Sequence, residues 1–425
     1  MNWHRLPAIL FVPAVLAAAA APETAAGRFL RLHWFERGSA HGNPGTDKDR
    51  FRVNAPEAVI SRFASRSETS ASGMMQILMR EDLTRLAGAE LYLELWGGHP
   101  YTSNKRVTPN GRTTYPIPEV GAAGGHCTHH YPVIPLKITD LVNGYNALQF
   151  ACDQGKSFWG HYIVDNACIR AVLKRDHPDL AAAGLAGFDA AVRARPAAGD
   201  ERMELELEVA GGAADQVAEV EFHGFYEGFD ENGDGATTDW HGFTKARNPA
   251  AIAGAASAPP FRAVWDTSMV IGGEARFRAL VRFRGLPQLV YETAATAPAA
   301  LPSKGRAAVR QFLCAEIPAP FTSRIKREKT CRIPVDIDPS SIERAELHVV
   351  VWDGGRGTVE DYFTLNGRAL PVAGQGRHDV IYSQVPLEPA LLRRGPNLVR
   401  LLSDTEHHGI EVLLPGPAIV VRYRR

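Results

Sequence analysis

One short acidic segment has the residue types and spacing of a cation-binding loop. It reads Asp-Glu-Asn-Gly-Asp-Gly-Ala over residues 230–236, with side-chain oxygens at positions one, three and five and glycine at position six. Such a loop can wrap Ca²⁺. An EF-hand needs a carboxylate at position twelve, but His241 stands there. We expect a non-EF-hand Ca²⁺ loop with the ligands Asp230, Asn232, Asp234, Ala236 (through its carbonyl) and Asp239. The alternative is an acidic β-turn held by its own side chains.

Histidine side chains concentrate in the first 175 residues, with several aromatic and basic side chains near them. The candidates for ligand binding are His99, Tyr101, Arg106, His126, His130, Trp159 and His161. Imidazoles suit Zn²⁺, Cu²⁺ or acid–base catalysis, whereas aromatic faces stack on sugars and charged groups bind hydroxyls or carboxylates. The spacing of residues 126–130 matches no established zinc motif, so the simpler interpretation treats these histidines as polar loop residues.

The five cysteines fit export to an oxidising compartment. Cys127 and Cys152 bracket one strand-containing segment, and Cys314 and Cys331 flank one loop, so each pair could close a local disulfide. Cys168 lies in an apolar run and is expected to be a buried thiol. Other pairings stay open.

The beginning of the chain has the features of a targeting segment. A fixed positive charge at Arg5 precedes an apolar run to about Ala20 and then small residues, which predicts a signal peptide over residues 1–26. We therefore expect a secreted or periplasmic protein with no stable membrane span after cleavage. The alternative, an uncleaved anchor, would place two prolines in a weak span.

Two distant segments of the chain resemble each other in the order of their features. Each has an apolar strand ending in tryptophan and glycines (residues 88–98 and 344–355), then Asn-Gly-Arg (110–112 and 366–368). Each continues through a Pro-Leu strand and a Gly-x-Asn-x-Leu turn (144–148 and 395–399, with Val399 in place of leucine) to a final apolar strand. Asn-Gly favours tight hairpins. The positions of Trp96 and Trp352 within this repeat predict that both are core residues.

This pattern resembles the galactose-binding-like jelly roll, an accessory module of secreted glycosidases and lyases. The resemblance implies jelly-roll modules over residues 27–175 and 305–425. Between them, strictly alternating strands such as residues 203–209 resemble an immunoglobulin-like module over residues 185–300. The sequence thus predicts an all-β protein, with two jelly-roll-like β-sandwiches flanking an immunoglobulin-like β-sandwich.

Composition narrows the function further. The 425-residue chain has 47 basic and 47 acidic residues, so its charge balance argues against nucleic acid as a partner. It has no Gly-x-Ser-x-Gly, His-Glu-x-x-His or phosphate-loop motif. We expect a non-catalytic, Ca²⁺-stabilised protein that binds a polysaccharide or glycoconjugate or acts in surface interaction. The alternatives are a polysaccharide lyase or hydrolase with its site in the first module, and a purely structural envelope protein.

Overall fold

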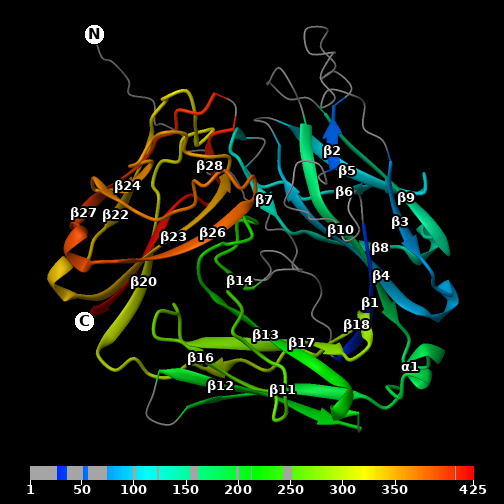
Figure 1. The fold of residues 1–425 in the computed structure, drawn as a ribbon. Coiled ribbons are helices and arrows are strands. Elements are labelled where there is room, and N and C mark those ends of the chain that lie inside the picture. Colours follow the sequence, from blue (N-terminus) through cyan, green and yellow to red (C-terminus); the bar gives the residue numbers. More distant parts are fainter. Residues whose placement is uncertain are drawn as a thin grey trace, which may run out of the picture.

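The protein folds almost entirely into antiparallel β-sheets in the computed structural model (Figure 1). The structure describes residues 26–35, 51–55, 74–98, 102–121, 124–153, 161–197, 201–211, 213–242, 251–406 and 408–425. Within these ranges the α-helix is α1 (Pro178–Ala182), and no helix in them is long and apolar enough to cross a bilayer. The prediction of an all-β, sandwich-class protein is confirmed. All but the last residue of the expected signal peptide lies outside the described residues.

The first module has two layers of strands. One contains β1 (Arg28–Trp34), β2 (Phe51–Asn54), β4 (Leu86–Trp96), β7 (His129–His130), β8 (Val133–Leu136) and β10 (His161–Leu173). The other has the order β3 (Met75–Met79), β9 (Gly144–Asp153), β5 (Ser103–Pro109) and β6 (Tyr115–Pro116). Alternate side chains of β3 are buried, because one face of this sheet packs on the core and the other faces solvent.

The third module pairs its strands in a corresponding order. One sheet runs β20 (Ala307–Leu313), β29 (Ala418–Arg424), β23 (Ile342–Asp353), β28 (Ile410–Val412) and β21 (Thr322–Ser323), with β26 (Val380–Leu387) paired to β23. The other runs β22 (Lys329–Val335), β27 (Gly395–Leu401), β24 (Phe363–Leu365) and β25 (Arg368–Ala369).

Two asparagine pairs, each with one fully buried member, fix the turns of these outer sheets. Asn110 donates to the side-chain oxygen of Asn146 at 2.9 Å, and Asn366 donates to that of Asn397 at 2.8 Å. Asn110 and Asn366 each also accept a hydrogen bond from the strand backbone beside them, at 2.9 Å. The two outer sheets therefore share an atomic arrangement as well as a strand order.

The middle module is joined to the first through a common sheet. Its strands β13 (Val217–Glu227), β14 (Thr238–Trp240), β15 (Gly254–Ala256), β17 (Glu274–Phe283), β18 (Leu286–Glu292) and β19 (Ala299–Ala300) continue the sheet of the first module, because β18 pairs with β1. A second sheet contains β11 (Asp189–Pro196), β12 (Arg202–Ala210) and β16 (Arg262–Asp266).

The hydrophobic cores follow this sheet pairing. One core contains residues of both the first and the middle module, including Phe29, whose ring centroid lies 4.9 Å from that of Tyr291. The third module has its own core. A smaller cluster, with Trp96, Cys127, Phe229 and Val350 among its members, joins all three modules. The three modules therefore meet through a small apolar cluster, and the strands that supply it approach one another near the middle of the molecule (Figure 1).

Candidate functional site

The expected ligand-binding residues of the first module do not form one open site among the described residues. His99, Tyr101 and Trp159 lie outside these residues. Arg106 lies on β5, where its guanidinium contacts Asp153 at 2.9 Å. Its strand neighbour Lys105 is buried and its charge reaches His130, whereas the Arg106 guanidinium pairs with Asp153.

His130 and His161 are buried on either side of the Gly97–Gly98 backbone. The ring of His161 packs on Trp96 with centroids 5.4 Å apart. Burial, with a contribution from the charge of Lys105, lowers the pKa of His130 to about 3, which keeps its imidazole neutral. His126 is half-buried, and burial lowers its pKa although a hydrogen bond to the backbone of Pro318 opposes this. His126 and His130 thus contact the third and middle modules, whereas His161 packs within the first.

All five cysteines are buried free thiols in the structure. The expected Cys127–Cys152 pair is not formed. Cys127 lies 3.5 Å from the hydroxyl of Thr322 in the third module, and Cys152 lies in the core of the first. Cys314 and Cys331 lie next to each other, with a hydrogen bond between their thiols. This bond lowers the pKa of Cys314 and raises that of Cys331. A Cys314–Cys331 disulfide remains a prediction.

The acidic segment forms a loop between β13 and β14, which we call the junction loop (residues 228–237). The carboxylate of Asp230 accepts backbone hydrogen bonds from Asp234 at 3.1 Å and Gly235 at 2.9 Å. The amide of Asn232 donates to Asp239 at 2.7 Å. These bonds are those of a turn held by its own side chains. Within the described residues no group of three or more His, Cys, Asp or Glu side chains is arranged to hold a metal ion.

The surroundings of the junction loop nevertheless disfavour ionised carboxylates at Asp230 and at the neighbouring Asp239 of β14. Burial, followed by the charge of Asp234, raises the pKa of Asp230 to about 7 and that of Asp239 to about 6. A bound cation would relieve both effects. The donor set, with three carboxylates, one amide oxygen and one carbonyl, is chemically suited to Ca²⁺.

The junction loop also holds the modules together. The carbonyl of Gly233 lies 3.2 Å from Nδ1 of His130 in the first module. A side chain at this glycine would meet the carbonyl oxygen of His129 at 2.6 Å, and its φ is +66°. Only glycine fits this approach without strain. On the other side, the ring of Phe229 stacks on Tyr382 of the third module, with centroids 5.6 Å apart.

Beside the junction loop lies a cleft of about 280 Å³ between the middle and third modules, which we call the module 2–3 cleft. It combines aromatic rings with carboxylates and hydrogen-bonding groups, a mixture typical of sites that stack and orient sugars. The middle module contributes Tyr226, Glu227, Glu231, His241, Trp265 and Asp266, and the third contributes Arg344, Glu346, His348, Tyr382 and Gln384.

Four side chains on the third-module wall form a continuous polar relay. Glu346 lies 3.3 Å from Nε2 of His348, whose Nδ1 lies 2.7 Å from the hydroxyl of Tyr382. Gln384 donates to the same hydroxyl at 2.8 Å. The hydrogen bond from His348 lowers the pKa of Glu346, so this carboxylate is ionised and accepts from Nε2. Nδ1 is then free to accept the phenol proton.

The opposite wall carries a second histidine–carboxylate pair. Nδ1 of His241 lies 3.6 Å from Glu231, and its Nε2 lies 3.0 Å from the Tyr226 carbonyl. Burial disfavours the imidazolium, but Glu231 outweighs burial and raises the pKa of His241. The charge of Glu231 and burial both raise the pKa of Tyr382, with burial the larger cause.

A sequence pattern that indicates one wall of this cleft is present in the third module but was not recognised as a binding-site signal. Arg344, Glu346 and His348 alternate along β23, which places three polar side chains on one face of a strand otherwise expected to be core. Tyr382 and Gln384 do the same on the neighbouring β26. The residues of the middle-module wall could not be found in this way. They face β23 and β26 only because the two modules pack together in the folded chain, and no local sequence pattern indicates that packing.

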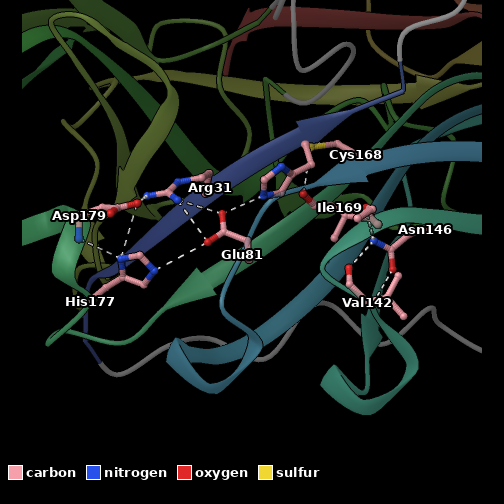
Figure 2. A network of polar contacts seen from close by, with 10 residues as sticks. Arg31, Glu81, Val142, Asn146, Cys168, Ile169, His177 and Asp179 are labelled. Atoms are coloured by element: carbon pink, nitrogen blue, oxygen red, sulfur yellow. Dashed lines mark hydrogen bonds and ion pairs between the residues drawn. The ribbon is translucent and has the colours of Figure 1, made fainter.

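Two other polar regions are better explained as structural. A groove of about 1050 Å³ lies between the middle module and residues 300–305, but its Arg422 and Glu201 pair with each other at 2.8 Å. Figure 2 shows the second region, where Glu81 is almost fully buried and pairs with Arg31 at 3.1 Å. Glu81 also lies 3.0 Å from His33 and 3.7 Å from His177. This network anchors β1 to the α1 region.

Comparisons with known proteins identify no family. No protein-family model matches the chain, and no curated protein matches it. Among solved structures it is similar to a β-porphyranase of glycoside hydrolase family 86 from the human gut bacterium Bacteroides plebeius, with 13% identity, a TM-score of 0.23 and coverage of 56% of this chain and 37% of that chain. Two BuGH86 chains in complex with neoagarooctaose match at 10% and 11% identity and a TM-score of 0.23, covering 55% of this chain and 33% of theirs. The chain thus spans about a third of the length of these proteins.

Proposed function

We propose that the protein is an exported, non-catalytic glycan-binding protein whose main site is the module 2–3 cleft. The observation that carries this proposal is the composition of the cleft, where the rings of Tyr226, Trp265 and Tyr382 lie beside Arg344 and Gln384. Rings stack on the C–H faces of sugars, and the guanidinium and amide can bind their hydroxyls. This proposal places the main site between the middle and third modules, whereas the sequence had suggested the first module.

Retention of the purified chain on a panel of immobilised polysaccharides tests this proposal. The double variant Arg344→Ala/Gln384→Ala removes two exposed polar groups from the cleft and should weaken retention at least tenfold. Arg193→Ala, which removes an exposed arginine paired with Glu208 on the β11–β12 sheet, is the matched control and should bind as wild type. Unchanged retention of the double variant would exclude the cleft, and no retention by any polysaccharide would favour a structural envelope protein.

We further propose that the junction loop binds Ca²⁺ through Asp230, Asn232, Asp234 and the Ala236 carbonyl, together with Asp239 of the adjacent β14. The raised pKa values of Asp230 and Asp239 support this, because a bound cation would offset both the burial of these carboxylates and their repulsion by Asp234. Added Ca²⁺ should raise Tm, since a ligand selective for the folded state stabilises it. The increase should disappear in Asp234→Ala and persist in the control Glu208→Ala. Absence of any Ca²⁺-dependent change in the wild-type chain would leave a self-stabilised acidic turn.

A second candidate function, a polysaccharide-active enzyme, is favoured by the Glu346–His348–Tyr382 relay. In this arrangement Tyr382 can take a proton from a bound hydroxyl or water while its own proton passes to Nδ1 of His348, and Glu346 stabilises the imidazolium. New reducing or unsaturated ends during incubation with the same polysaccharides would establish this function. They should be lost in Tyr382→Phe while retention persists. No new ends from the wild-type chain would leave binding alone.

A further inference from the structure

The module 2–3 cleft carries more negative than positive charge. Among the described residues that line it are four carboxylates, those of Glu227, Glu231, Asp266 and Glu346, and one fixed positive charge, that of Arg344. The balance stays negative even when both histidines of the cleft are counted as cations. The whole chain has 47 basic and 47 acidic residues, so this excess is a local property of the cleft.

The charge of Arg344 is already matched inside the cleft. Its guanidinium lies 2.7 Å from the carboxylate of Glu346 and 3.8 Å from that of Asp266. An arginine between two carboxylates can still donate to a sugar hydroxyl, but it adds little net attraction for an anion. A polyuronate chain would therefore approach a cleft whose charge has the same sign as its own.

Two carboxylates of the middle-module wall are accessible to a ligand. The side chain of Glu227 is exposed, and in the part of the chain that the structure describes its carboxylate has no hydrogen-bond or ion-pair partner. The side chain of Asp266 is 61% exposed and accepts a hydrogen bond from the backbone of Ser268 at 2.8 Å. Arg202, which lines the neighbouring groove, compensates the charge of Asp266 in part. Glu227 is thus the less compensated of the two.

The aromatic rings of the cleft favour a ligand of positive charge as well. The ring centroids of Tyr226 and Trp265 lie 4.8 Å apart on the middle-module wall, and Tyr382 lies on the opposite wall. The faces of such rings attract an ammonium group. A primary ammonium also has three N–H donors, which carboxylates accept in strong, charge-assisted hydrogen bonds. Rings and carboxylates together therefore match a protonated amine.

From this balance we infer that the module 2–3 cleft selects a glycan with free amino groups over neutral and anionic chains. The inference rests on the proposed glycan-binding function and adds the charge of the sugar. Its protonated amine binds Glu227 and Asp266, while Gln384 binds hydroxyls. A basic peptide is the competing cation, but peptides bind along sheet edges or in long grooves. A compact cleft of about 280 Å³ between two modules suits a sugar unit better.

Three β-1,4-linked hexamers with a common backbone and different charge test this inference by isothermal titration calorimetry. Chitohexaose carries an amine at C2 of each sugar, cellohexaose a hydroxyl, and cellohexauronate a carboxylate at C6. At about pH 5.5, where sugar amines are protonated, chitohexaose should bind at least tenfold tighter than cellohexaose, and cellohexauronate should not bind. The preference should shrink as salt is added. Chitohexaose binding no tighter than cellohexaose, or no binding of chitohexaose, would overturn the inference.

A matched pair of double variants separates the cleft from non-specific attraction. Glu227→Gln/Asp266→Asn removes two charges, keeps the side-chain shapes and should abolish the preference for chitohexaose without changing cellohexaose binding. Glu204→Gln/Glu208→Gln removes two exposed carboxylates on β12, outside the cleft, and should keep the preference. Equal losses in the two variants would overturn the inference. Tighter binding of hexalysine than of chitohexaose would overturn it in favour of a basic peptide.

The variant Arg344→Ala/Gln384→Ala distinguishes failure of this inference from failure of the proposed function. If this variant loses retention on neutral polysaccharides while the wild-type chain shows no preference for chitohexaose, the cleft binds glycans without selecting amines. If its retention is unchanged, the proposed function fails together with the inference.

Discussion

In the first module, the carboxylate of Glu81 is almost fully buried and lies beside the side chains of Arg31, His33 and His177. Removing one partner of a buried ionic network leaves the others desolvated and unpaired. Glu81→Ala should therefore lower the free energy of unfolding by about 3–5 kcal/mol. Urea denaturation measures this. The control Glu208→Ala breaks an exposed pair with Arg193 and should cost less than about 1 kcal/mol; similar costs for the two variants would contradict the argument.

The buried neutral state of His130 predicts a pH dependence. Its pKa is about 3 in the folded chain, against about 6.5 in an unfolded one. Between these values the unfolded state binds the extra proton, so this residue removes stability as pH falls below about 6.5, by up to about 1.4 kcal/mol per pH unit. His130→Asn should destabilise the protein at pH 7.5 and less so at pH 4.5. An equal loss at both pH values, measured by urea denaturation, would show that His130 does not titrate in this way.

At the scale of strands and turns, the sequence was informative because the signals are local. Alternation predicted the half-buried strand over residues 203–209, which is part of β12. The Asn-Gly pairs predicted positive φ, and the values are +50° and +67° at Asn110 and Gly111. Residues 344–355 were expected to form an apolar strand, but Glu346 and His348 on β23 line the cleft. An alternating strand shows which side chains share a face but not whether a partner module leaves that face open.

The matched asparagines make these turns testable. Asn110→Ala and Asn366→Ala each remove hydrogen bonds to a buried asparagine and to backbone, and should each lower the free energy of unfolding by about 1–3 kcal/mol. Asn366→Gly keeps the positive φ accessible and isolates the contribution of the amide. Differential scanning calorimetry measures the shift in Tm. If Asn366→Gly were as stable as wild type, the amide bonds would not be what holds the turn.

At the scale of the whole molecule, sequence reasoning treated the three modules as separate units. That view missed the cleft and the junction, since both are formed by residues far apart in the chain. The pairing of β18 with β1 depends on two strands that each have ordinary alternation, and nothing local marks one as the partner of the other. The comparison of the chain with itself did suggest that the terminal modules share a scaffold, but it could not show which faces each module presents.

The shared sheet predicts that the first and middle modules unfold together. Phe29 on β1 contacts both Phe188 and Tyr291, with ring centroids 6.1 Å and 4.9 Å away. Phe29→Ala should cost about 3–5 kcal/mol and reduce hydrogen-exchange protection in β10 and β17 alike. Leu365→Ala, in the separate core of the third module, should cost a comparable amount and leave both strands protected. Loss of protection in β10 alone after Phe29→Ala would mean that the common sheet joins two modules that remain independent in stability.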